Sequence, residues 1–395
     1  MAEKGKNMFE HIGAVILREL HRMFERPIYL YGAIFILAFS AIFMFTLMDE
    51  GQPHNLPIGM VDEDESYISR TAYNQINSLP GVEVIHKYSS YTEARVAMQE
   101  GHIFGFIHIP KETYKKALKG EQPTISCYYT ESFYVPGTFV YRNFLTMATV
   151  LNMGVRRSLL RAHGTDEVII QPQIQPIITE VHGIGNPWGS YAIYLISILW
   201  PGILSLCIIV MTVFTIGFEL KSQTSIEWFK CGGKSFVNAL IGKLTPYFII
   251  YLILGVAFEF LAYRIVGFPL MGSFWKMLIT ITLLILASFA VGIFMIGLLP
   301  ILRLALSAAS LYSILGLSMS GMTYPVESMI GPMQGMAQIF PIRQYYLITV
   351  KWGILGGGIE NCWINILGLM LFCFLPFTVF NRLKNGLLNQ IYPQE

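Results

Sequence analysis

The chain has 395 residues, of which 54% are hydrophobic and 13% are charged, and its formal net charge is +2. Soluble domains carry about 25% charged residues. The composition therefore excludes an ordinary soluble protein and indicates a multi-pass membrane protein.

A membrane-spanning helix needs about 20 mostly apolar residues, and six segments of this kind follow one another along the chain. The first covers residues 28–48 and reads as a signal anchor, because it is full length and follows a charged stretch. The other five lie within residues 190–380 and begin at Ser190, Tyr247, Met277, Leu304 and Asn361.

Between the first two spans, residues 49–189 alternate strand and helix patterns. "NLPIGMVDEDES", "GVEVIHKY", "IFGFIHIP" and "TISCYYTES" read as strands, and the segments between them as helices, the first opened by Ser66. Such alternation predicts an α/β domain. The expected fold is an α-helical polytopic membrane protein with six transmembrane helices and an extracytoplasmic α/β domain inserted between helices 1 and 2.

Candidate metal ligands in this domain are few. The acidic run at residues 62–65 is read as a solvated turn at a helix start rather than a cation site. His86, His102 and His108 lack zinc-site spacing. No metal is assigned, and Cys127, alone in the domain, is expected to be buried.

Positive charges set the orientation, because lysine and arginine in short connections stay in the cytoplasm. Twelve such residues lie in residues 1–27, in the strip after the second span, at Arg303 and in the tail 381–395, against four on the opposite side. Both termini are therefore expected in the cytoplasm, with residues 49–189 outside.

The segment 1–27 has apolar residues near helical spacing among arginines and glutamates, which favours an amphipathic helix lying in the membrane interface over a simple cytoplasmic tail. The strip at residues 217–247 contains "CGGKSF", which superficially resembles the end of a phosphate loop. Trp228 stands where that loop needs a glycine. No nucleotide site and no catalytic residue is expected in this chain.

The strip resembles the coupling segment of permease subunits in the ABC type-2 exporter family. Glu219, Thr224 and Glu227 match the family's spacing, and Gly242 with Lys243 supplies its Gly-Lys, whereas Gln223 and the Gly232–Gly233 pair depart from it. The entry segment "ELHRMFERPIYLY" and "PVESM" are also similar to segments of this family, and "PIGMVDEDES" is similar to the subgroup with a large extracytoplasmic domain after the first span. The resemblance covers essentially the whole chain.

The resemblance implies that residues 219–243 dock an ATPase subunit. The charged residues expected to be exposed there are Glu219, Lys221, Glu227 and Lys230. Ile226, Trp228 and Phe229 are expected to form an apolar anchor, although aromatic residues also anchor helices at membrane boundaries. The expected coupling residues are Glu219, Lys221, Thr224, Glu227, Trp228 and Lys243.

Two further groups follow from the resemblance. Residues 325–345 are expected to form a re-entrant gate, with helix breaks at Pro325 and Pro341 and with Glu327 beside them. The second and fifth spans are expected to face a dimer axis and line the substrate pathway with Trp200, Met211, Phe214, Ser318, Met319 and Met322.

Glu259 lies inside the third expected span. An intramembrane carboxylate is a functional candidate by default. Pairing with Arg264, or extension of the side chain to the membrane surface, is the alternative explanation.

The expected function is the permease subunit of an ATP-driven exporter that moves a hydrophobic or amphipathic compound, or a lipid, outward across the inner membrane. It binds no cofactor itself, and ATP and Mg belong to a partner ATPase. The other expected partners are a second permease copy, identical or paralogous, membrane lipid and a periplasmic adaptor, but no nucleic acid. The alternatives are a non-transporting sensor or assembly platform and a proton-coupled antiporter that uses Glu259.

Overall fold

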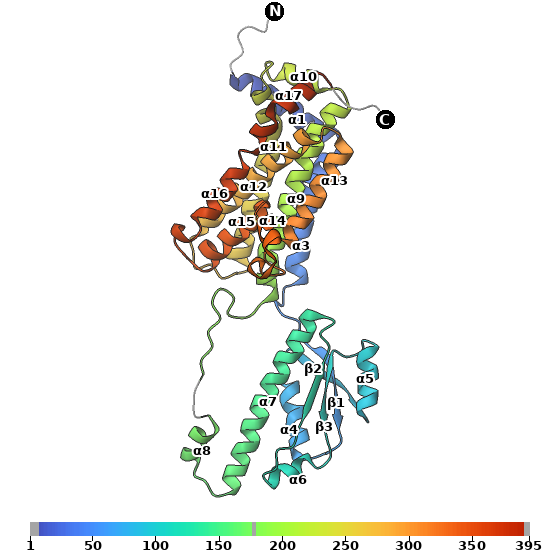
Figure 1. Cartoon of the computed structure of the whole chain (residues 1–395), viewed down its shortest axis with the longest axis vertical. Helices are drawn as coiled ribbons and strands as arrows, with labels where there is room; N and C mark the ends of the chain where they lie inside the picture. Colours follow the sequence, from blue (N-terminus) through green and yellow to red (C-terminus); the bar gives the residue numbers. More distant parts are fainter. Residues whose placement is uncertain (1–7, 176–178, 391–395) are drawn as a thin grey trace, which may run out of the picture. The chain divides into compact units, whose positions relative to one another are not determined.

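The computed structural model describes residues 8–175 and 179–390. The chain divides into two compact units, one formed by residues 1–49 and 183–395 and the other by residues 50–182. Figure 1 shows the helical first unit and the mixed second unit, which are described separately below.

The first unit is a helical bundle. Among the described residues, five helices are long and apolar enough to cross a membrane. They are Pro27–Leu47, which comprises α2 (Pro27–Leu30), η1 (Tyr31–Phe35) and α3 (Ile36–Leu47); α9 (Tyr191–Lys221); α11 (Phe236–Phe260) with η2 (Leu261–Ile265); α12 (Phe274–Leu298); and Trp363–Leu388, which comprises α16 (Trp363–Phe372) and α17 (Leu375–Leu388).

The sixth expected span, at residues 304–322, differs from the prediction. It forms α13 (Leu302–Ser318), an apolar helix of 17 residues. At 1.5 Å per residue it is about 25 Å long, somewhat less than the roughly 30 Å hydrocarbon core. Ser320 Oγ donates to the carbonyl of Leu317 and accepts from the backbone of Met322, where the chain leaves the helix.

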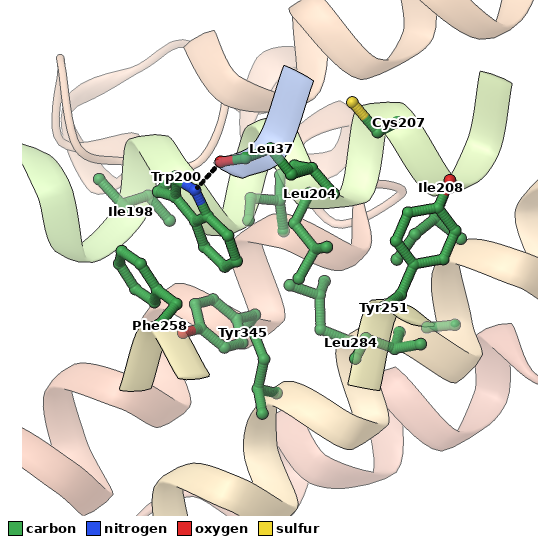
Figure 2. Packing of buried hydrophobic residues seen from close by; sticks show 14 of the residues in the cluster. Leu37, Ile198, Trp200, Leu204, Cys207, Ile208, Tyr251, Phe258, Leu284 and Tyr345 are labelled. Atoms are coloured by element: carbon green, nitrogen blue, oxygen red, sulfur yellow. Dashed lines mark hydrogen bonds between the residues drawn. The ribbon is translucent and has the colours of Figure 1, made fainter. Parts of the chain in front are cut away.

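Helix α9 forms the centre of the bundle and packs against α12 and α13. Its Trp200 is 1% exposed, lies parallel to the ring of Phe258 with centroids 4.0 Å apart, and donates its indole N–H to the carbonyl of Leu37. Figure 2 shows this packing, with Tyr345 approaching from another element. The core thus joins α3, α9 and α11 around one tryptophan.

The segment between α13 and α16 is broken into short pieces. They are η3 (Val326–Ser328), α14 (Gly331–Ala337), α15 (Pro341–Ile348), η4 (Thr349–Ile354) and η5 (Ile359–Asn361). Tyr312, in the middle of α13, donates its hydroxyl to the carbonyl of Ile339. The turn before α15 therefore contacts α13 about ten residues after the start of that helix.

The second unit is an α/β domain. Its elements are β1 (Leu56–Asp62), α4 (Tyr67–Asn77), β2 (Val82–Tyr88), α5 (Tyr91–Gln99), β3 (Gly105–Ile109), α6 (Thr113–Leu118), β4 (Ser126–Tyr129), α7 (Tyr134–Ala162) and α8 (Glu167–Ile174). The sheet has the order β2-β1-β3-β4, in which β1 pairs in parallel with β2 and β3, and β4 is antiparallel to β3. The strands and helices expected from the sequence are present, and Ser66 caps α4 as expected.

Both faces of the sheet are covered. Ile58 and Met60 of β1 pack with α4 and α7, whereas Val61 and Phe106 pack with Ala94 of α5 on the other face. Figure 1 shows α5 on the opposite side of the sheet from α4 and α7. This alternation gives the unit a hydrophobic core of its own.

Candidate coupling site

The strip after α9 is more helical than expected. Helix α9 continues to Lys221, a short helix α10 covers Ser225–Cys231, and α11 begins at Phe236. Helix α11 thus begins about three turns before Tyr247, the expected start of the third span, and Lys243 lies on a buried face of that helix. Figure 1 shows α10 beside α1 (Met8–Glu25) and α17 at one end of the bundle.

Two turns in this strip have left-handed backbone. Gln223, between α9 and α10, has φ 57°, and the turn between α10 and α11 contains Gly233 at φ 66° and Lys234 at φ 62°. A Cβ atom on Gly233 would lie 2.8 Å from the ring of His11. Gly233 therefore permits both the turn and the close approach of α1.

A buried carboxylate organises the site. Glu219, near the end of α9, accepts two hydrogen bonds from the guanidinium of Arg18, at 2.7 and 3.1 Å. It also accepts from Arg22 and from the hydroxyl of Thr224. Glu219 is fully buried, so each of its oxygens is held by donors from α1 or from its own turn.

A second carboxylate joins α1 to α11. Lys243 donates to Glu219 at 2.9 Å and to Glu19 at 2.7 Å, and Tyr247 donates its hydroxyl to Glu19 at 2.9 Å. The ammonium of Lys243 also lies 5.1 Å from the centre of the Trp228 ring. One connected network of charged and polar groups thus links α1, α9, α10 and α11.

The cluster contains three cations, Arg18, Arg22 and Lys243, and two carboxylates, Glu19 and Glu219. Partial burial acts to lower the pKa of Arg18, but the hydrogen bond and the negative charge of Glu219 outweigh it and raise the pKa above its ordinary value. Arg18 therefore stays charged. Such a cluster holds helices in fixed positions, and its groups face one another.

The expectation that Glu219 is exposed is wrong, since it has no exposed surface. Trp228 and Phe229, expected as an apolar anchor for a partner, are 0% and 4% exposed and belong to the chain's own core. Trp228 donates its indole N–H to the carbonyl of Ala239. The structure brings Glu219, Thr224 and Lys243 together, with Trp228 beside them.

A different set of side chains faces outward from the strip. Lys221, Ile226, Glu227 and Lys230 are exposed, on the end of α9 and on α10. We call these four residues the α10 surface. Of the six expected coupling residues, only Lys221 and Glu227 belong to it.

Sequence reasoning missed Arg18, Arg22, Glu19 and Tyr247 as members of the site. A signal for Glu19 exists: Val15, Glu19 and Met23 are spaced by four residues, and all three are buried. A carboxylate on the apolar stripe of an amphipathic helix requires a buried partner. The identity of that partner, 224 residues away, is not readable from spacing.

The six expected pathway residues lie in separate environments. Trp200 and Met211 are 1% and 7% exposed and are packed inside the bundle, and Phe214 contacts Tyr29. Ser318 is exposed at the end of α13, whereas Met319 and Met322 are half-buried in the following turn. Their role in substrate passage stays a prediction.

The expected gate segment contains one ion pair. Glu327, in η3, accepts from the guanidinium of Arg343 in α15 at 3.3 Å, and Arg343 also donates to the carbonyl of Ser320. Pro341 begins α15 and is buried, whereas Pro325 is exposed. The pair ties the start of the segment to the helix near its end.

Glu259 does not extend to a surface, since it is 1% exposed. The hydroxyl of Tyr345 donates to its Oε1 at 3.1 Å. The guanidinium of Arg264 instead lies 5.3 Å from the centre of the Phe274 ring. The expectation that Glu259 pairs with Arg264 or extends outward is therefore wrong.

The acidic turn of the α/β unit distributes its carboxylates among separate partners. Asp62 accepts from the backbone of Asp64 and Glu65, Asp64 accepts from the backbone of Tyr114, and Glu63 lies 3.2 Å from His108. The geometry is that of a hydrogen-bonded turn.

The chain was compared with known protein families and with curated proteins. A family model described as ABC-2 family transporter protein matches residues 28–380. The comparison with curated proteins gives no match. Since the family model spans most of the chain, including both units and the coupling strip, the chain belongs to the ABC-2 family of membrane transporters.

Proposed function

We propose that this chain is the permease subunit of an ATP-driven exporter that moves a hydrophobic or amphipathic compound, or a lipid, outward across the inner membrane. ATP, Mg and hydrolysis belong to a separate ATPase subunit. Family membership implies association with ABC ATPase subunits. The export direction, the cargo class, the dimer of identical or paralogous permeases and an adaptor are parts of this proposal.

The observation that carries the proposal is the network around Glu219. It fixes α1, α9 and α11 to one another through the fully buried Glu19, Glu219 and Lys243, beside Trp228 of α10. A force applied to the α10 surface would act on helices that are already held together, so movement of a docked ATPase would reach α9 and α11. The mixed charges of Lys221, Glu227 and Lys230 suit a polar docking contact.

Charge reversal on the α10 surface tests docking separately from folding. We expect Glu227→Lys with Lys230→Glu to reduce co-purification of an ATPase from the native cell by at least tenfold, with no change in the melting temperature of the permease. Lys116→Glu, on exposed α6 of the other unit, is the matched control. Recovery of no ATPase with the unaltered chain would instead favour the sensor or platform function.

A proton-coupled antiporter is the second candidate, because one buried oxygen of Glu259, Oε2, has no hydrogen-bond partner among the described residues. An unpaired buried carboxylate oxygen is suited to carrying a proton. Antiport predicts that Glu259→Gln abolishes flux driven by a pH gradient. ATP-driven flux that survives in Glu259→Gln would exclude this mechanism.

A further inference from the structure

A cavity of about 630 Å³ lies between α12, α13, α15 and α16. Its volume is within the range of roughly 300–1,000 Å³ that is usual for small-molecule sites. The apolar wall includes Phe294 and Met295 of α12 and Leu371 and Phe372 of α16. None of the six residues expected on the substrate pathway lines it, so the cavity is separate from that pathway.

Three side-chain amides line the same cavity and form a chain. Asn365 of α16 donates to the amide oxygen of Gln344 at 2.7 Å, and Gln344 of α15 donates to the amide oxygen of Gln338 at 2.9 Å. Lys351 donates to the oxygen of Asn365 at 3.4 Å. Gln344 and Asn365 are 5% and 8% exposed, so these amides are buried polar groups within an apolar wall.

Helix α16 is shaped to admit this chain of amides. A Cβ atom on Gly368 would lie 3.2 Å from the amide carbon of Gln344. A side chain at that position would therefore push Gln344 away from Asn365. Gly368 places the amide chain against α16 and leaves it facing the cavity.

The amides have hydrogen-bonding capacity left over. A primary amide can donate two hydrogen bonds and accept two. Among the hydrogen bonds of the described residues, the nitrogens of Asn365 and Gln344 donate one each. Unused amide hydrogen-bonding capacity that is removed from water is unfavourable, so a ligand with its own hydroxyl or carbonyl group would be favoured over a plain hydrocarbon.

The residue types that line the cavity narrow the chemical class of its ligand further. Its lining residues, all in the described part of the chain, include no Asp, Glu, Lys, Arg or His. A charged head placed there would lose its hydration and would meet no counter-ion among the lining residues. Ile364 and Leu371, which also line the cavity, are 66% and 70% exposed, so an apolar molecule can reach it from the side of the bundle.

We propose that this cavity binds one neutral single-chain amphiphile, with its hydroxyl or carbonyl group on Asn365 and Gln344 and its hydrocarbon tail against the wall formed by Phe294, Met295, Leu371 and Phe372. The site does not rest on the proposed transport function, because it requires binding alone.

Photolabelling tests the site on the full chain in lipid nanodiscs, with a monoacylglycerol that carries a diazirine in its tail as the probe. We expect labelled peptides from α12 and α16, and unlabelled monoacylglycerol should compete at least tenfold better than the matching alkane or fatty-acid anion. Asn365→Leu should reduce the labelling at least tenfold.

Two glycine-to-alanine variants control for the chance that Asn365→Leu reduces labelling through a folding defect. Gly368→Ala displaces Gln344 and should weaken labelling about tenfold. Gly386→Ala in α17, where a Cβ would meet no side chain of the described residues within 4 Å, should leave labelling unchanged. Equal competition by alkane and anion, labelling spread over other helices, or wild-type labelling of both Asn365→Leu and Gly368→Ala would each overturn the proposal.

Discussion

Replacing Glu219 with glutamine tests whether the buried charge network holds the helices together. The change keeps the shape of the side chain but removes the carboxylate that accepts from Arg18, Arg22 and Lys243. The three cations are then left with Glu19 as their one carboxylate in the network. Because these cations remain close together, repulsion adds to the lost attraction.

The expected loss of stability follows from burial. Removing one partner of a buried ion pair costs about 3–5 kcal/mol, because the remaining charge is left uncompensated. The side chains of Arg18 and Arg22 keep 20% and 14% of their exposure and can regain some hydration. We therefore expect Glu219→Gln to lower the free energy of unfolding by about 3 kcal/mol, near the lower end of that range.

The assay is unfolding of the detergent-solubilised chain by titration with sodium dodecyl sulfate, followed by tryptophan fluorescence, since Trp228 lies beside Lys243. Glu227→Gln, exposed on the same strip, is the matched control and should change stability by less than about 0.5 kcal/mol. The double variant Glu219→Gln with Lys243→Met should lose less than the two single variants added together. Equal and small losses in Glu219→Gln and Glu227→Gln would refute the reasoning.

Three further predictions concern other parts of the chain. Gln223→Gly should raise the free energy of unfolding by up to about 1 kcal/mol in the same titration, because φ 57° is unfavourable for a residue with a Cβ atom. A lower free energy of unfolding would show that the glutamine side chain is needed in this turn. Cys127, expected to be buried, is half-buried, and this partial burial raises the pKa of its thiol to about 11. At pH 7 maleimide should therefore label it at least tenfold more slowly in the folded chain than after unfolding, and equal rates would contradict this reasoning. Residues 50–182 expressed alone should unfold in one cooperative transition by circular dichroism, since their core lies within the unit, whereas a broad transition would show that they need the helical unit.

The α/β unit could be read from the sequence because its signals are local. Strand alternation, turn residues and the cap at Ser66 each act over a few residues, and the strands expected around Ile58 and Phe106 are present. The apolar helices were equally readable from composition. The start of α11 was not, since Lys243 interrupts the apolar pattern although its charge is neutralised inside the bundle.

The coupling strip shows where local reasoning stops. Matching the strip by spacing identified Glu219, Thr224 and Lys243, which do meet. The expectation of a charged docking helix with an apolar anchor placed Glu219 and Trp228 at the surface, where they do not lie. The direction of each side chain is set by α1, whose Arg18 lies 201 positions from Glu219 in the sequence. Contacts over such separations depend on the packing of whole helices, which no short pattern encodes.

The sequence separation between Arg18 and Glu219 has a consequence for the synthesis and membrane insertion of the protein. Ribosomes add about 5–20 residues per second, so roughly 10–40 s pass between the synthesis of Arg18 and that of Glu219. Throughout that interval, α1 carries Arg18, Glu19 and Arg22 without the groups that will neutralise them. The nascent helix α1 must therefore stay in water or at the lipid headgroups. It can pack against α9 and α11 only after the chain has been synthesised past Lys243.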